Sequence, residues 1–145
     1  MTQEEKELLL KDLCARSPYK VKVQIDFGEH CIKYGIDRYV NDTVICVWPE
    51  TFEVGVNDED QACDIEDVKP YLRPMSSMTE EEEAEYRKYV FCNPYLGEKH
   101  LESTLMCIDW LNEHHFDYRG LIEKGLAIEA PVGMYNTKKR INKDE

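Results

Sequence analysis

The sequence predicts a small α+β domain, in which an antiparallel sheet or an SH3-like barrel packs against an N-terminal helix and two to three C-terminal helices. Two observations lead to this prediction. Residues 20–73 hold about four or five short runs of β-branched and aromatic residues, separated by turn residues. The segments on either side, 2–16 and 79–118, place apolar residues three or four positions apart, as on one face of a helix.

The length of the chain favours a single domain. Its 145 residues are enough to bury a hydrophobic core without disulfides or metals. We expect one domain over residues 1–137, with a β-rich part at 18–73 and a helical part at 79–128. The charged residues at 138–145 predict a flexible tail of mixed basic and acidic character.

The first predicted element is a helix that begins at a capping box formed by Thr2 and Glu5. Leucines at positions 8, 9, 10 and 13 give this helix an apolar side. It is expected to end near Arg16, because a Ser-Pro pair follows.

Four runs in the β-rich part predict strands, because apolar and polar residues alternate along them or β-branched residues dominate. Residues 61–72 predict a short helical turn followed by a closing strand. The four runs are Lys20–Phe27, Cys31–Ile36, Thr43–Trp48 and Thr51–Val56.

Two helices are predicted in the C-terminal half. The first begins at a capping box formed by Thr79 and Glu82 and continues to about Phe91. The second begins at Ser103 and ends before Gly120, because glycine readily adopts the left-handed conformation that ends helices. Residues 121–129 then predict either a short final helix or a turn plus a strand.

The second of these helices has a wide apolar face. Leu105, Ile108, Leu111 and His115 recur at helical spacing, and Met106, Trp110 and His114 follow on an adjoining line. We therefore expect most of this helix to be covered and the rest of the chain to pack around it.

The net charge of −12 is concentrated in one part of the chain. Residues 50–85 hold thirteen carboxylates against Lys69 and Arg73, so this segment alone carries a charge of −11. Such a balance disfavours direct binding of nucleic acid, which requires a cationic surface. The segment is either a solvated surface that maintains solubility or an acidic face that meets a basic partner.

The sequence also predicts the compartment. The longest apolar run, Val44–Trp48, is far too short to span a membrane, and the N-terminus lacks the features of a signal peptide. We therefore expect a cytoplasmic protein. The six cysteines show no metal-binding or redox spacing, and a reducing cytosol favours six free thiols.

Three segments resemble an uncharacterised family of small proteins carried by phages and mobile elements of gut bacteria. These segments are 68–82, with the sequence VKPYLRPMSSMTEEE, 109–122, with DWLNEHHFDYRGLI, and 124–131, with KGLAIEAP. The family has no established activity, so the resemblance implies a setting rather than a reaction. It implies an accessory protein of a phage, acting in the cytoplasm of its host.

No catalytic residue, metal site or cofactor is predicted. His114 and His115 are adjacent, whereas a metal pair on a helix requires ligands four positions apart, as in HExxH. No cysteine or serine has a recognisable base beside it, and glycine-rich phosphate loops are absent. His115 is interpreted as a core residue.

The predicted binding residues fall into two groups. Trp110, His114, Tyr118 and Arg119 combine aromatic and arginine side chains, the types that dominate protein interfaces. For Trp110 and the neighbouring Phe116, packing in the core is the favoured alternative, because large aromatic residues are mostly buried. The second group consists of the consecutive acidic residues Glu80, Glu81, Glu82 and Glu83.

Two classes of function follow from these residues. The first is a non-enzymatic protein that binds a host or phage protein through an acidic face. A basic or nucleic-acid-binding partner would match the charge of this face. A sharper form of it is an acidic nucleic-acid mimic that inhibits a host defence or DNA-processing enzyme. The second is a small nucleotide-binding protein or enzyme with a pocket at His114, Asp117, Tyr118 and Arg119. The oligomeric state stays open.

Overall fold

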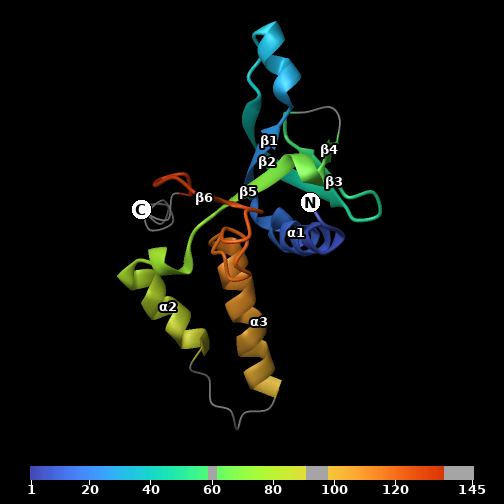
Figure 1. Ribbon diagram of the computed structural model, residues 1–145. Coiled ribbons are helices and arrows are strands. Elements are labelled where there is room, and N and C mark those ends of the chain that lie inside the picture. Colours follow the sequence, from blue (N-terminus) through green and yellow to red (C-terminus); the bar gives the residue numbers. More distant parts are fainter. Residues whose placement is uncertain (59–61, 91–97, 136–145) are drawn as a thin grey trace.

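The computed structural model describes residues 1–135 apart from 59–61 and 91–97, and it confirms a mixed α+β fold. The body of the molecule is a curled sheet with helix α1 (Gln3–Arg16) packed against it (Figure 1). As predicted, α1 begins at a capping box, in which the Thr2 hydroxyl accepts a hydrogen bond from the Glu5 amide and the Glu5 carboxylate accepts one from the Thr2 amide.

The sheet has six strands in the order β4-β3-β2-β1-β5-β6. The first four form an antiparallel meander, β5 returns to pair antiparallel with β1, and β6 joins β5 in parallel. No pairing within the described residues joins β4 to β5 or β6, so the sheet is open and the antiparallel-sheet alternative is confirmed. The strands are β1 (Lys22–Asp26), β2 (Tyr39–Trp48), β3 (Glu53–Val56), β4 (Cys63–Asp64), β5 (Val68–Leu72) and β6 (Ile128–Glu129).

The long strand β2 gives the sheet its curl. Its first half pairs with β1, its second half pairs with β3, and the register shifts between Val44 and Cys46. Such an irregularity bends a strand and increases its twist. The sheet therefore wraps partly around the side on which α1 lies.

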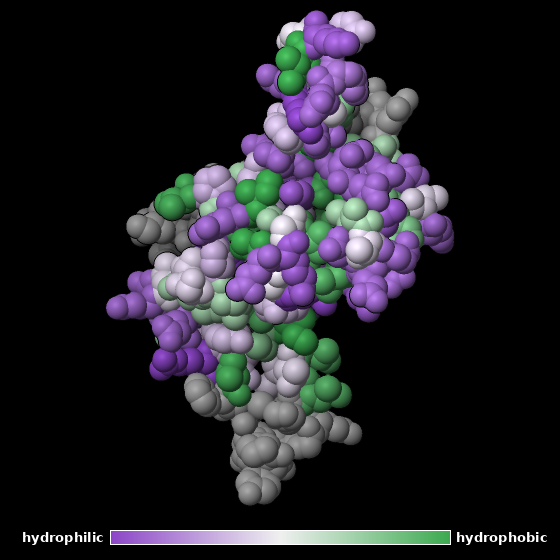
Figure 2. All heavy atoms as spheres, viewed as in Figure 1, coloured by the Kyte–Doolittle hydropathy of each residue, from purple (hydrophilic) through white to green (hydrophobic). Residues whose placement is uncertain are grey.

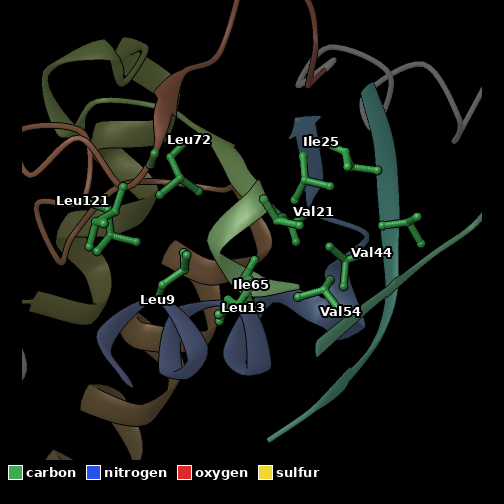
Figure 3. Close-up of a cluster of buried hydrophobic side chains, with 14 residues drawn as sticks. Leu9, Leu13, Val21, Ile25, Val44, Val54, Ile65, Leu72 and Leu121 are labelled. Carbon is green, nitrogen blue, oxygen red and sulfur yellow. The ribbon is translucent and has the colours of Figure 1, made fainter. Parts of the chain in front are cut away.

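The main core lies between α1 and this concave side of the sheet (Figure 3). Leu9 and Leu13 of α1 are fully buried there, beside Ile65 from the turn that precedes β5. The predicted alternation in β1 is confirmed. The buried residues of the main core are Leu9, Leu13, Val21, Val23, Ile25, Val44, Val54, Val56, Ile65, Val68, Leu72, Leu121, Leu126 and Ala127.

The structure confirms the prediction for the end of the β-rich part. The 3-10 helix η3 (Ile65–Asp67) leads directly into β5, as the sequence predicted for residues 61–72. Residues 121–129 form turns followed by β6, so the turn-plus-strand alternative is right.

The strand predicted at Cys31–Ile36 is wrong, because this stretch belongs to the 3-10 helix η2 (Glu29–Tyr34). Gly28 and Gly35 flank it with φ angles of 94° and 67°, which an extended strand does not have. The ion pair of Asp26 with Arg38 joins the two ends of the segment that contains η2. The tip of this segment projects away from the sheet (Figure 1).

Helices α2 (Glu80–Val90) and α3 (Glu98–Glu113) run in opposite directions and project together from the body (Figure 1). We call this pair the arm. The capping box predicted for α2 is confirmed, because Thr79 and Glu82 exchange hydrogen bonds between side chain and backbone. Phe91, where α2 was expected to end, and the tail at 138–145 lie outside the described residues.

The prediction for α3 is wrong at both ends. The helix begins at Glu98, so Ser103 lies inside it, and its last residue is Glu113, so Gly120 is not the residue that stops it. His115 ends it instead with a φ of 62°, while the Phe116 amide donates to the Leu111 carbonyl and the His115 amide to the Asn112 carbonyl. These two bonds form a Schellman motif with histidine in the position that glycine usually occupies.

The expectation that the chain packs around α3 is also wrong. Among the side chains of α3 that the structure describes, the buried ones lie at its C-terminal end, where Trp110 and Leu111 join Phe116 in a second, smaller cluster. Leu105, Met106 and Ile108 are 54%, 53% and 39% exposed. No helix among the described residues has the length and apolar character needed to cross a membrane.

We predict that replacing Leu13 with alanine lowers the free energy of unfolding by about 2–5 kcal/mol, because the fully buried side chain leaves a cavity between α1 and the sheet. Urea denaturation measures this change. The matched control is Cys14→Ala on the exposed side of the same helix, with an expected change of about 0.5 kcal/mol or less. Equal losses in the two variants would contradict this placement of the core.

Candidate binding surface

The arm is held together by an aromatic stack at its base. The Trp110 ring on α3 stacks on Tyr86 of α2 at 5.7 Å between centroids, on His114 at 4.1 Å and on Phe116 at 5.6 Å. His114 also places its Nδ1 at 2.8 Å from the Trp110 carbonyl. Because Trp110 is 4% exposed and Phe116 fully buried, the core-packing alternative is confirmed for both.

A buried ion pair attaches the arm to the sheet. Arg73, which follows β5, donates two hydrogen bonds to the Glu82 carboxylate at 2.8 and 2.7 Å, and its guanidinium lies 4.2 Å from the centre of the Phe116 ring. Burial acts to raise the pKa of Glu82, but the bonds from Arg73 and from the Thr79 amide outweigh it and lower the pKa. Glu82 therefore has a structural role, whereas Glu81 and Glu83 beside it are exposed.

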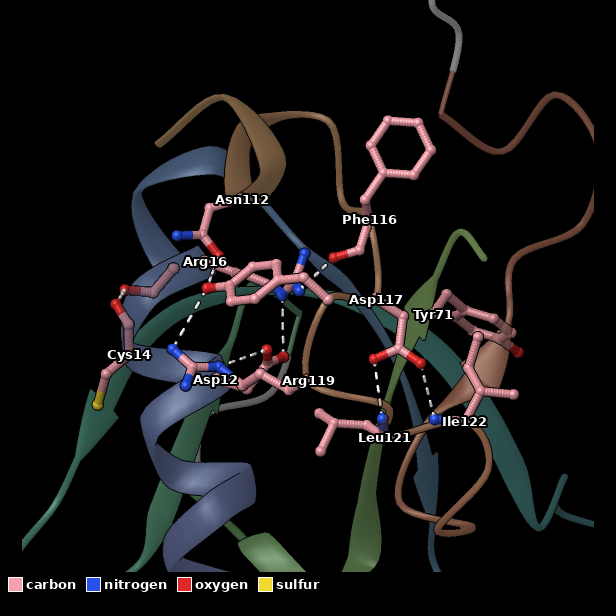
Figure 4. Close-up of polar contacts among 12 residues, drawn as sticks. Asp12, Cys14, Arg16, Tyr71, Asn112, Phe116, Asp117, Arg119, Leu121 and Ile122 are labelled. Atoms are coloured by element: carbon pink, nitrogen blue, oxygen red, sulfur yellow. Dashed lines mark hydrogen bonds and ion pairs between the residues drawn. The ribbon is translucent and has the colours of Figure 1, made fainter. Parts of the chain in front are cut away.

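A second buried cluster joins α1 to the segment after α3 (Figure 4). Arg16 and Asp12 are both fully buried and form an ion pair at 2.9 Å. Arg16 also donates to the Phe116 carbonyl at 2.6 Å, and Arg119 lies 3.3 Å from the other Asp12 oxygen. Both guanidinium groups lie over the Tyr118 ring.

Burial, charge and hydrogen bonds all act on the polar groups of this cluster. Burial raises the pKa of Asp12, and the charges of Arg16 and Arg119 and the bond from Arg16 counteract only part of this shift. Tyr118 donates its hydroxyl to Asn112 at 2.7 Å. The Asp117 carboxylate accepts hydrogen bonds from the backbone amides of Leu121 and Ile122. These bonds shape the turn that follows α3.

The residues predicted for a pocket therefore do not converge. His114 faces the aromatic stack of the arm, Asp117 holds a turn, and Tyr118 and Arg119 face α1. A pocket of about 350 Å³ does lie between Arg73, the start of α2 and residues 129–135, but none of these four side chains lines it. Among the described residues these four side chains have different neighbours, and the nucleotide-binding or enzymatic alternative stays a prediction.

The acidic segment does not form one continuous face. Glu80, Glu81 and Glu83 are exposed on the first turn of α2, where they lie at the positive end of the helix dipole. The other described carboxylates of this segment, apart from Glu82 and Glu85 of α2, lie around β3, β4 and η3, on the far side of the body from α2 (Figure 1). The negative charge of this segment is therefore exposed in two separate regions of the surface.

Sequence reasoning missed the exposed apolar side of α3. Leu101, Leu105 and Ile108 are 62%, 54% and 39% exposed, and their spacing puts them on one side of the helix. We call these three residues the α3 stripe. Two of them, Leu105 and Ile108, were recognised as a helical pattern but were assigned to the core. The sequence contains no signal that distinguishes a covered stripe from an uncovered one.

The described residues contain no group of three or more His, Cys, Asp or Glu side chains placed to hold a metal ion. Within the same part of the chain, Cys14, Cys31, Cys46, Cys63 and Cys107 form no disulfide. Comparison with protein-family models, with curated proteins and with solved structures gave no match to this chain.

We predict that Arg16→Met lowers the free energy of unfolding by about 3–5 kcal/mol, because it leaves the buried Asp12 without its main partner. The double variant Asp12→Leu/Arg16→Met removes both charges, and we expect it to be more stable than the single variant. Thermal or urea unfolding measures both. A double variant that is as unstable as Arg16→Met, or less stable, would show that the charges do not compensate each other.

We predict that Glu82→Gln destabilises the chain at pH 7 by about 1–3 kcal/mol and much less at pH 3. Because its pKa is lowered by folding, Glu82 stabilises the fold above its unfolded pKa of about 4.3, and this contribution is lost as the pH falls through the folded pKa. Urea unfolding at the two pH values checks the prediction. Glu83→Gln on the exposed side of α2 is the control, and its effect should be below about 1 kcal/mol.

Proposed function

We propose that this chain is a non-enzymatic binding protein that holds another protein on its arm. The observation that carries the proposal is the uncovered α3 stripe. Monomeric proteins rarely leave a regular row of large apolar side chains in water, and contiguous apolar patches often mark interaction sites. Here the row lies on a helix that projects from the body (Figure 1) and is firmly anchored at its base.

The acidic start of α2 supports the same proposal. Glu80, Glu81 and Glu83 are exposed on a helix whose base is fixed by Arg73 and Glu82. Exposed charge of one sign raises the rate and selectivity of association with a partner of the opposite sign. We therefore propose a partner with a basic surface.

The setting is proposed from the sequence resemblance alone. It suggests an accessory protein of a phage or mobile element that acts in the host cytoplasm. Within this setting, inhibition of a host enzyme by mimicry of nucleic acid is less well supported, because the carboxylates of residues 50–85 fall into two separated groups.

The test is affinity capture from a lysate of a gut bacterium, with elution in a salt gradient. We predict that the wild-type chain retains a basic protein and that Leu105→Asp/Ile108→Asp loses it, because these side chains lie in the stripe and their replacement leaves the core intact. Glu80→Lys/Glu81→Lys/Glu83→Lys should release the partner at lower salt.

Ile45→Asp provides the matched control, since Ile45 is 59% exposed on β2, far from the arm. Circular dichroism and thermal unfolding verify that each variant is folded. Equal capture by the wild type and by the Leu105→Asp/Ile108→Asp variant would refute the proposal.

A further inference from the structure

The α3 stripe lies on the side of the arm that α2 leaves open. With about 100° between successive residues, Leu101, Leu105 and Ile108 lie roughly opposite Trp110, the side chain through which α3 packs on α2. Figure 2 shows hydrophobic surface on the arm. The stripe is therefore a face to which another element can be added.

The stripe has the shape of a helix-binding site. Its residues are spaced i, i+4 and i+7 and extend over about 10 Å, or two turns. A second helix with the same spacing packs its ridge of side chains against such a row. A flat or branched ligand would leave part of the row uncovered.

Charge identifies the chemistry of that helix. The exposed carboxylates of Glu102 and Asp109 border the stripe on one side, and Glu113 continues this border. Burial raises the pKa of the nearby Tyr19, and the negative charges of Asp109 and Glu113 raise it further.

We infer that the α3 stripe binds a basic amphipathic helix of a partner protein. This inference rests on the proposed function and names its partner class. Apolar residues of the partner cover the stripe, and lysine or arginine side chains along one edge meet Glu102 and Asp109. A second copy of this chain would bring carboxylates against carboxylates, and an anionic membrane would be repelled, so the charges disfavour both.

The probe is a synthetic 18-residue helical peptide with leucine on one face and lysine elsewhere. Its binding to the protein is measured by fluorescence anisotropy. Two comparison peptides are a scrambled one of the same composition and one with glutamate in place of lysine. We expect the leucine–lysine helix to bind at least tenfold more tightly than either. Leu105→Asp should weaken its binding at least tenfold although it adds negative charge, whereas Ile45→Asp should leave binding unchanged.

Charge reversal provides a second variant. Glu102→Lys/Asp109→Lys should weaken binding of the leucine–lysine helix and reduce its dependence on salt. Equal binding of the scrambled or glutamate peptide would overturn the inference. So would a dimer, detected by sedimentation, that Leu105→Asp dissociates, or binding to anionic vesicles that depends on Leu105.

The two proposals fail in different ways. If Leu105→Asp/Ile108→Asp abolishes capture from the lysate but the leucine–lysine helix does not bind, the arm binds a protein and the inferred partner class is wrong. If capture is unaffected by that variant, the proposed function itself fails.

Discussion

The ion pair of Asp12 and Arg16 is the interaction on which the remaining structure depends. Both side chains are fully buried, and Arg16 donates to the backbone of Phe116, one hundred positions further along the chain. Next to this contact the segment after α3 packs on α1, and its Leu121, Leu126 and Ala127 lie in the main core. Because a buried charge without a partner is strongly destabilising, this geometry fixes the C-terminal segment on the N-terminal helix.

Attachment at this point explains why α3 is buried at Trp110 and Leu111 and exposed at Leu101 and Leu105. The left-handed turn at His115 reverses the chain after Trp110 and Leu111, and Arg73 and Glu82 hold α2 against the same base. Beyond that base, α3 contacts α2 on one side only. The consequence is a row of large apolar side chains that is exposed to solvent.

The acidic residues have two different roles that their sequence does not separate. Glu82 is buried in a bidentate pair with Arg73, whereas Glu80, Glu81 and Glu83 face the solvent. A run of four identical residues on a helix necessarily points in different directions, so only one of them faces the body. Three of them are therefore exposed at the surface, and the fourth has a structural role.

The sequence by itself determined the elements whose signals are local. The capping boxes at Thr2 and Thr79, the alternation of Val21, Val23 and Ile25 and the turn before β5 depend on near neighbours, and the structure confirms them. Only the tertiary structure decided which apolar rows are covered: Leu9 and Leu13 meet the sheet, whereas Leu101, Leu105 and Ile108 meet water. Periodicity defines a face of a helix, but contacts between distant residues, such as Arg16 with Phe116, decide whether anything packs on that face.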